Sequence, residues 1–468
     1  ELSRSHAHVR EQLNDSNLGF ARACNQGLSL AKNEILVLLN NDTIVLPGWL
    51  DNLRSTFDEH NRVGLAGSKL VYPNGTLQEA GGIVWKDGSA WNWGHRRNPE
   101  HPRYNYARDV DYCSGASIMI PRSLFEHLGQ FDTCYVPAYY EDTDLAFAVR
   151  QEGYRVLYQP QSVVVHYEGI SSGTDLASGV KKYQVENSSK FREKWRSQLQ
   201  EHLSNGHTPE IACDHEVRGH ILIVDAETPP PDKDSGSIDM VNLIKILIDM
   251  GYRVHFVPQT NYAQIPGYTE KLQRMGVVCV YAPHYKRIRD YLKDNPNLFD
   301  FVFLCREPVA SETFSTVRKL APDARIIFNT VDLHFLRLER EAALKNDQTL
   351  AREARRAKAS ELQLIRSCDN TILLSEAERE IVQKEAPEAV TTVVPLIRTI
   401  PGRNVGFEPR NGVVFIGGYN HRPNVDAVEW LISEIWPELR CMGAEISLKI
   451  CGSHMPEHFR DFAAKDIE

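Results

Sequence analysis

The sequence predicts an α/β protein composed of two α/β modules in series. Short apolar runs typical of buried strands alternate with stretches whose apolar residues recur at helical spacing. A polar, aperiodic stretch separates two such series. The 468 residues exceed the ~100–200 residues of an ordinary domain, and a hydrophobic content of 42% is sufficient for several cores.

Charge and composition argue against several classes of partner. The net charge is −9 and no long basic run occurs, so nucleic acid is not an expected partner. No apolar stretch reaches the ~20 residues of a membrane span, and no signal peptide is recognisable. The nine cysteines form no C-x-x-C pair, which argues against a disulfide framework or a structural zinc site. We therefore expect a cytoplasmic protein.

Residues 1–205 form the first predicted module. Asn17 is placed to cap a helix, the apolar run Ile35–Leu39 fits a central strand buried on both faces, and Pro47 suits the first turn of the next helix. Further apolar runs predict strands over residues 63–71, 117–120, 155–158 and 162–166. Helical spacing predicts a helix over residues 141–152, a charged amphipathic tail over residues 181–202 closes the module, and the Trp-rich residues 85–108 are expected to form a loop.

A second α/β series follows a predicted linker over residues 206–219. Its strand at 220–225, helix at 237–250 and strand at 253–257 form a βαβ unit of Rossmann type. Further strands are predicted at 301–304, 325–328 and 371–374. We place this domain at residues 220–405, and the start of another at 412–468, where a strand at 413–416 precedes a helix at 424–439.

Two polar residues at predicted strand ends are the first candidates for a site. Asp42 follows the strand Ile35–Leu39, and His166 ends the apolar run Val163–Val165. Ligand crevices form at the carboxyl ends of strands in open α/β sheets, and a carboxylate and an imidazole there could share a divalent metal. Two alternatives remain open: Asp42 could be a turn residue, and His166 could be a structural residue.

Three acids crowd the predicted start of the helix over residues 141–152. Glu141, Asp142 and Asp144 lie in its first turn, where the helix dipole favours negative charge. The acids could be only capping groups. A carboxylate held ionised at a helix start is also a usable general base.

Taken together, these residues resemble the family 2 glycosyltransferases of GT-A fold, especially rhamnosyltransferase-like and galactofuranosyltransferase-like members. The resemblance covers about residues 10–200 and rests on six stretches in the family's order. They are Asn17–Gly27, Leu38–Thr43, Pro47–Leu50, Cys113–Ala116, Glu141–Leu145 and Val165–Gly169.

The resemblance implies a role for individual residues. Asp42 matches the last acid of the family's DxD motif and would bind Mg²⁺ or Mn²⁺ with the donor diphosphate, and His166 would complete the metal site. Asp142 would be the catalytic base of an inverting displacement, with Glu141 as the fallback. The donor site would also include Gly19, Arg22, Asn25, Asn41, Ser114, Gly115 and Ala116.

The sequence departs from the family pattern in two respects. Asn40 stands where the first acid of DxD is expected, so the metal would rest on fewer charges. The family's opening strand and acidic nucleotide-binding motif would precede residue 1, and we therefore expect a chain truncated at its start.

The second series is similar to the family 4 glycosyltransferases of GT-B fold. The matching residues are His220–Asp225, Gly236–Gly251, Asp332–His334, Leu374–Glu376 and Ile416–Gly418. This resemblance implies a retaining transfer without metal, a donor bound mainly by the C-terminal lobe, and truncation of that lobe. It makes Gly236, His334 and Gly418 candidate site residues, although His334 could equally be an interdomain structural residue.

The resemblances imply a tandem glycosyltransferase of bacterial surface polysaccharide synthesis. It would take a nucleotide-sugar donor and a glycan or lipid-linked glycan acceptor, in the cytoplasm or at the inner face of the membrane beside an assembly machinery. The rival hypothesis is a catalytically impaired glycan-binding or assembly scaffold, motivated by Asn40. A nicotinamide-dependent oxidoreductase is disfavoured because the G-x-G-x-x-G fingerprint is missing.

Overall fold

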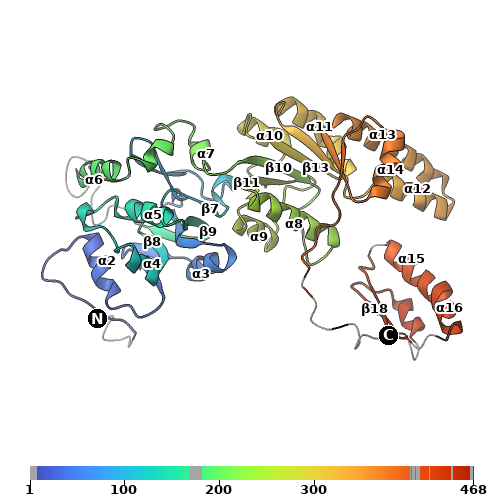
Figure 1. The fold of residues 1–468 in the computed structure, drawn as a ribbon, viewed down its shortest axis with the longest axis horizontal. Coiled ribbons are helices and arrows are strands. Elements are labelled where there is room, and N and C mark those ends of the chain that lie inside the picture. The colour runs from blue at the N-terminus through green and yellow to red at the C-terminus, as the bar shows by residue number, and fades with distance from the viewer. Residues whose placement is uncertain are drawn as a thin grey trace. The chain divides into compact units, whose positions relative to one another are not determined.

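The computed structural model describes residues 8–167, 182–400, 402, 406, 412–420, 422–443, 446–463 and 467. The chain divides into two compact units (Figure 1). The larger comprises residues 1–229 and 243–396, and the smaller comprises residues 230–242 and 397–468. Among the described residues, no helix is both long and apolar enough to cross a membrane.

The first sheet of the larger unit is mixed. Its central order is β1-β8-β3-β9-β2, with β4 beside β3 and β7 beside β9. Strands β3 and β9 are parallel, whereas the other pairs are antiparallel. The strands are β1 Ile35–Leu39, β2 Thr43–Val45, β3 Val63–Val71, β4 Leu77–Glu79, β7 Arg108–Asp109, β8 Ser117–Pro121 and β9 Arg155–His166.

Helices cover both faces of this sheet because alternate strand residues point to opposite sides. Met119 and Leu157 pack with Leu53 of α3 (Trp49–Glu59). Their neighbours in β8 and β9 join the cluster that contains Leu145 of α5 (Glu141–Gln151). The remaining elements are α2 Phe20–Leu28, the hairpin β5 Gly82–Val84 and β6 Ala90–Asn92, α4 Arg122–His127, α6 Lys182–Lys194, α7 Pro209–Ala212, and the 3₁₀ turns η1 Pro102–Tyr104, η2 Thr133–Tyr135 and η4 Gln198–Glu201.

Several sequence predictions for this part need correction. Strand β1 is not buried on both faces, because β8 is its only strand partner in the described chain and Leu39 is 42% exposed; the long strand β3 is instead buried at every residue. The strands predicted at 155–158 and 162–166 are one strand, β9. Helix α2 begins after Gly19 instead of Asn17, and α3 begins at Trp49, beyond Pro47. The predicted loop 85–108 contains β6, η1 and the start of β7.

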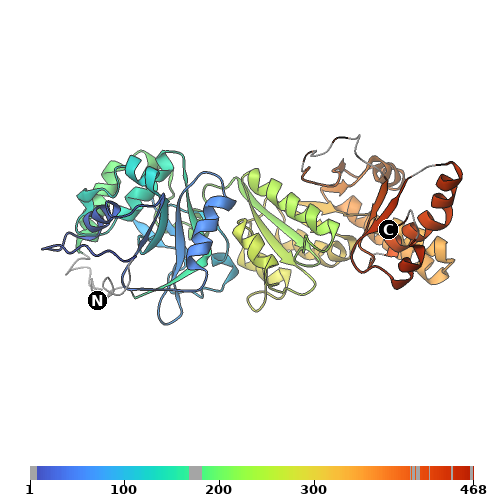
Figure 2. The ribbon, with the colours of Figure 1, turned by 90° about the horizontal axis from the view of Figure 1, so that it is seen from below.

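The second sheet is parallel throughout, in the order β12-β11-β10-β13-β14-β15-β16. Figure 1 shows α10 and α11 on one face and α8 and α9 on the other, and Figure 2 gives the view from below. The strands are β10 Gly219–Asp225, β11 Tyr252–Pro258, β12 Val278–Cys279, β13 Phe301–Cys305, β14 Arg325–Asn329, β15 Asn370–Leu373 and β16 Thr391–Val393. The helices are α8 Ser235–Asp249, α9 Tyr268–Arg274, α10 Ile288–Asp294, α11 Glu307–Leu320, α12 His334–Lys345, α13 Gln348–Ser367 and α14 Glu376–Glu385.

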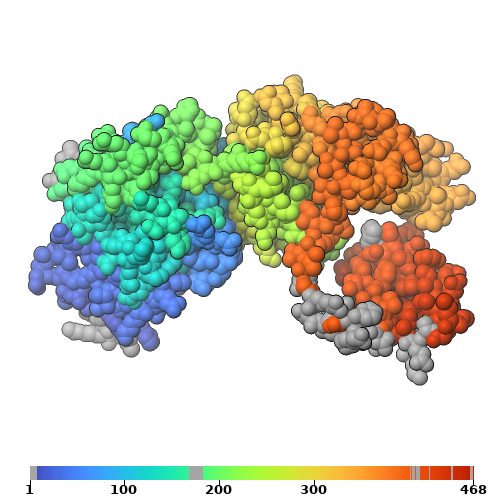
Figure 3. Space-filling view, in the orientation of Figure 1, coloured from blue at the N-terminus to red at the C-terminus, as the bar shows by residue number. Residues whose placement is uncertain are grey.

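The predicted βαβ unit is therefore present, and its sheet has the doubly wound arrangement. The strand order reverses between β10 and β13, which are adjacent in the sheet. Helices α12 and α13 pack against each other, and their residues are gold to orange in Figure 3.

The smaller unit contains the parallel pair β17 Val413–Ile416 and β18 Leu448–Cys451. Its helical segment is α15 Arg422–Trp430, a π-helical turn Leu431–Ile435 and α16 Trp436–Cys441. The helix predicted over 424–439 thus exists, interrupted by the π turn. A short 3₁₀ segment, Glu457–Phe462, contributes Phe459 to the core of this unit.

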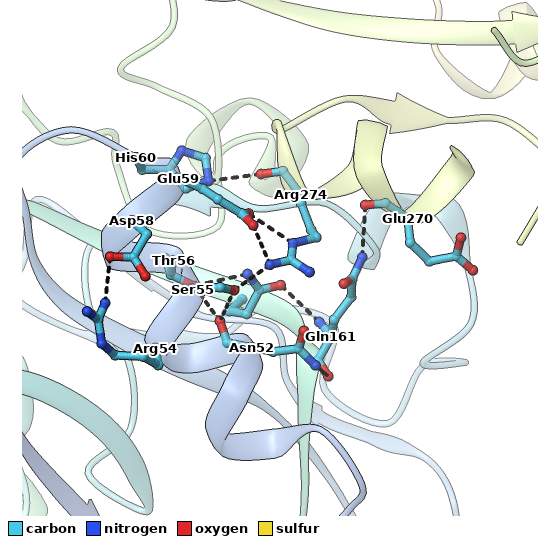
Figure 4. Close-up of polar contacts among 11 residues, drawn as sticks. Asn52, Arg54, Ser55, Thr56, Asp58, Glu59, His60, Gln161, Glu270 and Arg274 are labelled. Atoms are coloured by element: carbon cyan, nitrogen blue, oxygen red, sulfur yellow. Dashed lines mark hydrogen bonds and ion pairs between the residues drawn. The ribbon is translucent and has the colours of Figure 1, made fainter. Parts of the chain in front are cut away.

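Within the larger unit, helix α9 of the second sheet contacts helix α3 of the first (Figure 4). The Arg274 guanidinium pairs with the Glu59 carboxylate and donates to Ser55 Oγ, and the Arg274 carbonyl accepts from His60 Nε2 at 2.9 Å. The Gln161 amide donates to the Glu270 carbonyl at 2.9 Å. These polar contacts link the two sheets of this unit.

Candidate active site

Asp42 and His166 come together at one edge of the first sheet. Antiparallel pairing of β2 with β9 places Thr43 opposite His166, and the Tyr167 amide donates to the Asp42 carbonyl at 2.9 Å. His166 Nε2 lies 3.3 Å from Asp42 Oδ1, and both side chains are mostly buried. The register of these two strands therefore brings Asp42 and His166 together, although 166 − 42 = 124 positions separate them in the sequence.

The donor set of this pair fits a divalent cation. An imidazole nitrogen and a carboxylate oxygen are both suitable ligands for Mn²⁺, and a site with few protein ligands leaves positions for substrate phosphates. His166 Nδ1 is buried without a hydrogen-bond partner in the described structure. Hydrogen bonding within the fold therefore does not explain why a histidine occupies this position. The residues present could hold such an ion.

Asp142 is tied to the loop over residues 114–116. Its Oδ2 accepts from the Gly115 amide at 2.9 Å, and its Oδ1 accepts from the Thr143 amide at 2.7 Å and the Thr143 hydroxyl at 3.2 Å. The Ala116 carbonyl in turn accepts from the Asn40 amide at 3.0 Å. A short path of hydrogen bonds therefore connects the Asp142 carboxylate with the backbone two residues before Asp42.

The neighbouring acids Glu141 and Asp142 are both affected by burial, but their hydrogen-bond partners differ. Desolvation, followed by the charge of Asp142, raises the pKa of the Glu141 carboxyl to about 8, and Glu141 Oε2 has no hydrogen-bond partner in the described structure. Desolvation also raises the pKa of Asp142, but the donors on Gly115 and Thr143 favour its ionised form. Near neutral pH, Glu141 is therefore mainly protonated, whereas the Gly115 and Thr143 donors around Asp142 favour its carboxylate form.

Asp144, the third acid of the cluster, has a structural role. Its Oδ1 accepts from Trp195 Nε1 at 2.7 Å and from the Tyr135 hydroxyl at 3.0 Å, and its Oδ2 pairs with Lys194 at 2.8 Å. The carboxylate is buried and both oxygens are occupied. It anchors the segment after α6 to α5.

The candidate donor residues have different environments. Gly19 precedes α2 with φ +78°, and the side-chain amide of Asn25, within α2, exchanges two hydrogen bonds with the Phe131 backbone. Arg22 and Asn41 are exposed on the surface. Ser114 is half-buried, at the start of the loop that contacts Asp142.

Two residues that sequence reasoning missed hold this loop. Buried Glu79 accepts from the Ser114 amide through Oε1 at 2.9 Å, and Trp49 Nε1 donates to Ser117 Oγ at 2.9 Å. Trp49 lies in a stretch already matched to the family. Glu79 carries no local signal, because only the tertiary fold brings β4 to this loop.

The three tryptophans of residues 85–108 have different environments. Trp85 is fully buried and Trp93 is 7% exposed, so both are core residues. Trp91 is 43% exposed, and its ring lies edge-on to that of Trp85 at 5.0 Å.

The candidate residues of the second series have different local surroundings. His334 begins α12, and the carboxylate of buried Glu361 accepts from its backbone amide at 3.2 Å. Gly236 lies in the first turn of α8, where the Asp234 carboxylate already accepts from the Ser237 amide. Gly418 follows β17, and its carbonyl accepts from Asn424.

The switch point of the second sheet carries an ion pair that sequence reasoning missed. Asp225 ends β10, and its Oδ1 lies 2.9 Å from Arg306 Nε, just beyond β13. Asp225 is buried. The parallel order of β10 and β13 places these two strand ends side by side.

Comparison with known proteins gives the class of the first domain. Residues 2–129 match the family model described as "Glycosyl transferase family 2". The domain is therefore of the glycosyltransferase class, EC 2.4. More particularly, the N-terminal part of the chain is a family 2 glycosyltransferase domain.

Three curated relatives match the chain over part of its length. The uncharacterized protein y4gI of Sinorhizobium fredii is 27% identical over 37% of this chain and 20% of its own length. The O-antigen biosynthesis protein RfbC of Myxococcus xanthus is 34% identical over 31% of this chain and 12% of its own length. The N-acetylglucosaminyl-diphospho-decaprenol L-rhamnosyltransferase of Mycobacterium tuberculosis is 26% identical over 36% of this chain and 62% of its own length. The chain thus spans a fifth or less of the first two relatives and under two thirds of the third.

Proposed function

We propose that this protein transfers a sugar from a nucleotide-sugar donor to a glycan or lipid-linked glycan acceptor in bacterial polysaccharide synthesis, with the GT-A-type domain at residues 1–205 as an inverting catalyst. The observation that carries the proposal is the 3.3 Å approach of His166 Nε2 to Asp42 Oδ1, joined through the loop 114–116 to Asp142. The O-antigen protein and the rhamnosyltransferase among the relatives support a polysaccharide product.

The reaction is a single displacement. The acceptor hydroxyl oxygen forms a bond to the anomeric carbon as the bond from that carbon to the donor phosphate oxygen breaks, which inverts the configuration. The hydroxyl proton passes to the Asp142 carboxylate, and a nucleoside diphosphate leaves. Mg²⁺ or Mn²⁺ held by Asp42 and His166 would neutralise the charge of the departing diphosphate.

Asp142 is favoured over Glu141 as the base for a physical reason. A general base must be unprotonated at the working pH, and the pKa of Glu141 is about 8. The Gly115 and Thr143 donors orient both oxygens of Asp142. Glu141 then serves as a neutral neighbour that avoids a second buried negative charge.

For the second series we propose a GT-B-type domain at residues 220–405 and its partner lobe over residues 412–468, after a linker at 206–219. The parallel sheet with a switch point between β10 and β13 supports a ligand crevice there. Its retaining chemistry and the candidate residues Gly236, His334 and Gly418 belong to this proposal. A location at the inner face of the membrane would suit a lipid-linked acceptor.

The base assignment is tested by Asp142→Asn in the whole protein, with a panel of nucleotide-sugars and Mn²⁺. We expect transfer to fall by about 10²–10⁴-fold, the usual contribution of a general base. The variant should remain folded with a lowered melting temperature, because the Asn amide nitrogen cannot accept from Gly115 or Thr143. The matched control is Asp58→Asn on α3, whose exposed carboxylate pairs with Arg54 and should leave the rate unchanged. Full activity in Asp142→Asn would overturn the assignment.

A catalytically impaired scaffold is the competing outcome, since Asn40 replaces an acid of the metal motif. Calorimetry with nucleotide-sugars and Mn²⁺ separates the two. Metal-dependent donor binding agrees with the enzyme, whereas binding of glycan without any donor binding agrees with the scaffold.

A further inference from the structure

A cluster of two histidines and an aspartate lies where the first sheet meets the segment leading to the second. Asp111 follows β7, His202 follows η4, and His215 precedes β10. One potential ligand atom from each of the three lies within 4.8 Å of the others. His215 Nε2 is 3.7 Å from Asp111 Oδ1, and the two imidazole centroids are 5.2 Å apart.

Hydrogen bonds to the backbone fix the tautomer of both histidines. His202 Nδ1 lies 2.7 Å from the Val84 carbonyl, and His215 Nδ1 lies 2.9 Å from the Ala212 carbonyl. A carbonyl oxygen only accepts, so each Nδ1 carries the hydrogen and each neutral ring keeps its lone pair on Nε2. Metal-binding histidines are usually oriented in this way, with the second nitrogen donating to a carbonyl.

The aspartate is equally well positioned. Asp111 is 3% exposed, its Oδ2 accepts from the Val84 amide at 2.8 Å, and its Oδ1 is 3.0 Å from Arg150 Nη1. Arg150 also pairs with Glu216, whose Oε1 lies 3.9 Å from His215 Nε2. When both imidazoles are neutral, the carboxylates of Asp111 and Glu216 and the guanidinium of Arg150 have a net charge of −1. This negative charge would favour binding of a cation.

The distances and access suit a transition metal. Ligand atoms of a tetrahedral zinc site are ~3.3 Å apart, given Zn–N and Zn–O lengths of about 2.0–2.1 Å, so the 3.7 Å separation of His215 Nε2 and Asp111 Oδ1 requires a contraction of a few tenths of an ångström. His202 requires a larger adjustment, because its Nδ1, bonded to Val84, is the nitrogen 3.8 Å from Asp111 Oδ2, and separations within the set extend up to 4.8 Å. Two cavities of about 490 and 310 Å³ reach the cluster, one lined by Asp111 and His215 and the other by His202. An ion could therefore enter from solvent.

We propose that Asp111, His202 and His215 form a structural binding site for Zn²⁺, with Glu216 as the fourth ligand. Nitrogen and carboxylate oxygen ligands without cysteine are within the range of zinc chemistry. The ion would fasten the segment before β10 to the first sheet. The site is separate from Asp42 and His166 and does not depend on the proposed transfer reaction.

The test is Zn²⁺ binding by the whole protein after treatment with a chelator. We expect one zinc ion per chain at this site and a rise in melting temperature on adding Zn²⁺. His215→Ala should weaken Zn²⁺ binding by about 100-fold or more, because loss of a direct ligand should exceed the 10–100-fold cost of losing an outer partner. Asp111→Asn, which preserves shape, should do the same.

Two further variants distinguish this site from others. His207→Ala removes an exposed histidine of the same segment and should bind Zn²⁺ at this site as the parent does. Asp42→Asn removes a ligand of the divalent-cation site proposed for transfer and should keep the zinc ion held by Asp111, His202 and His215. If the parent binds no Zn²⁺, or if His215→Ala and Asp111→Asn bind it with unchanged affinity, the proposal is wrong. Loss of binding in Asp42→Asn alone would assign the zinc to the other site and likewise overturn it.

Discussion

The residues of the candidate site differ in how readily a sequence reveals them. Asp42 and His166 were foreseeable as strand-end residues, but their 3.3 Å contact depends on the β2–β9 register, which no local pattern encodes. Asp144 belongs to the same acidic run as Asp142, yet its carboxylate is buried beneath Trp195. Spacing alone could not separate these two roles, because the difference is set by tertiary neighbours.

Glu141 should make stability depend on pH. Its pKa is about 8 in the folded protein against an ordinary value of 4.5, so between these values the folded state binds more protons than the unfolded state. The contribution of Glu141 to the free energy of unfolding is fully present below pH 4.5 and declines as the pH rises toward 8. Glu141→Gln, which cannot ionise, should be more stable than the parent at pH 9 by on the order of 1–3 kcal/mol.

Thermal unfolding at pH 6 and pH 9 measures this effect. The parent should lose more stability between these pH values than Glu141→Gln does. Equal losses in the two proteins would show that Glu141 ionises normally in the folded state.

At the scale of elements, the helices and strands were largely predictable from apolar periodicity, whereas their ends and burial were not. Strand β3 matches its predicted range of 63–71. The run Ile35–Leu39 has the composition of a buried strand, but β1 is less buried because burial depends on neighbours in the sheet. The start of α2 was misplaced because Gly19 ends the preceding turn by its backbone conformation, while Asn17 Oδ1 accepts from the Gly19 amide.

Helix α2 offers a matched pair of glycines. Gly19 has φ +78°, and a Cβ there would lie 2.8 Å from the Pro137 carbonyl oxygen. Gly19→Ala should destabilise the helix by at least about 1–2 kcal/mol from the left-handed backbone alone. Gly27→Ala has open space around its Cβ and should instead stabilise the helix by up to ~1 kcal/mol.

Amide hydrogen exchange over residues 20–28 is the measurement. It should become faster in Gly19→Ala and slower in Gly27→Ala. Faster exchange in both variants, or no change in Gly19→Ala, would contradict this account of how the helix begins.

At the scale of the whole molecule, two α/β series were apparent in the sequence, and the structure contains a mixed and a parallel sheet accordingly. Their contact was not predictable. The segment read as an aperiodic linker includes α7 and buried Asp214, which accepts from Tyr106 and pairs with Arg253. Polar residues with no periodicity resemble a linker in sequence even when partners far away bury them.

Arg274 tests the contact between the sheets. Its guanidinium joins Glu59 and Ser55 of α3, but it is partly exposed, so its removal should cost only ~1 kcal/mol. Arg274→Ala should therefore speed amide exchange in α9 by roughly fivefold, the equivalent of that free energy. Lys271→Ala, an exposed change on the same helix, is the control, and the same exchange rate in both variants would show that the ion pair contributes nothing.

The central claim is that Asp42 and His166 form a divalent cation site beside Asp142, and Mn²⁺ binding followed by electron paramagnetic resonance tests it most directly. The whole protein is titrated with Mn²⁺, alone and with UDP, GDP or dTDP. The account predicts a bound ion that is lost in Asp42→Asn and in His166→Ala but kept in Asp142→Asn, with tighter binding in the presence of one nucleoside diphosphate. Unchanged Mn²⁺ binding in Asp42→Asn and His166→Ala would contradict it.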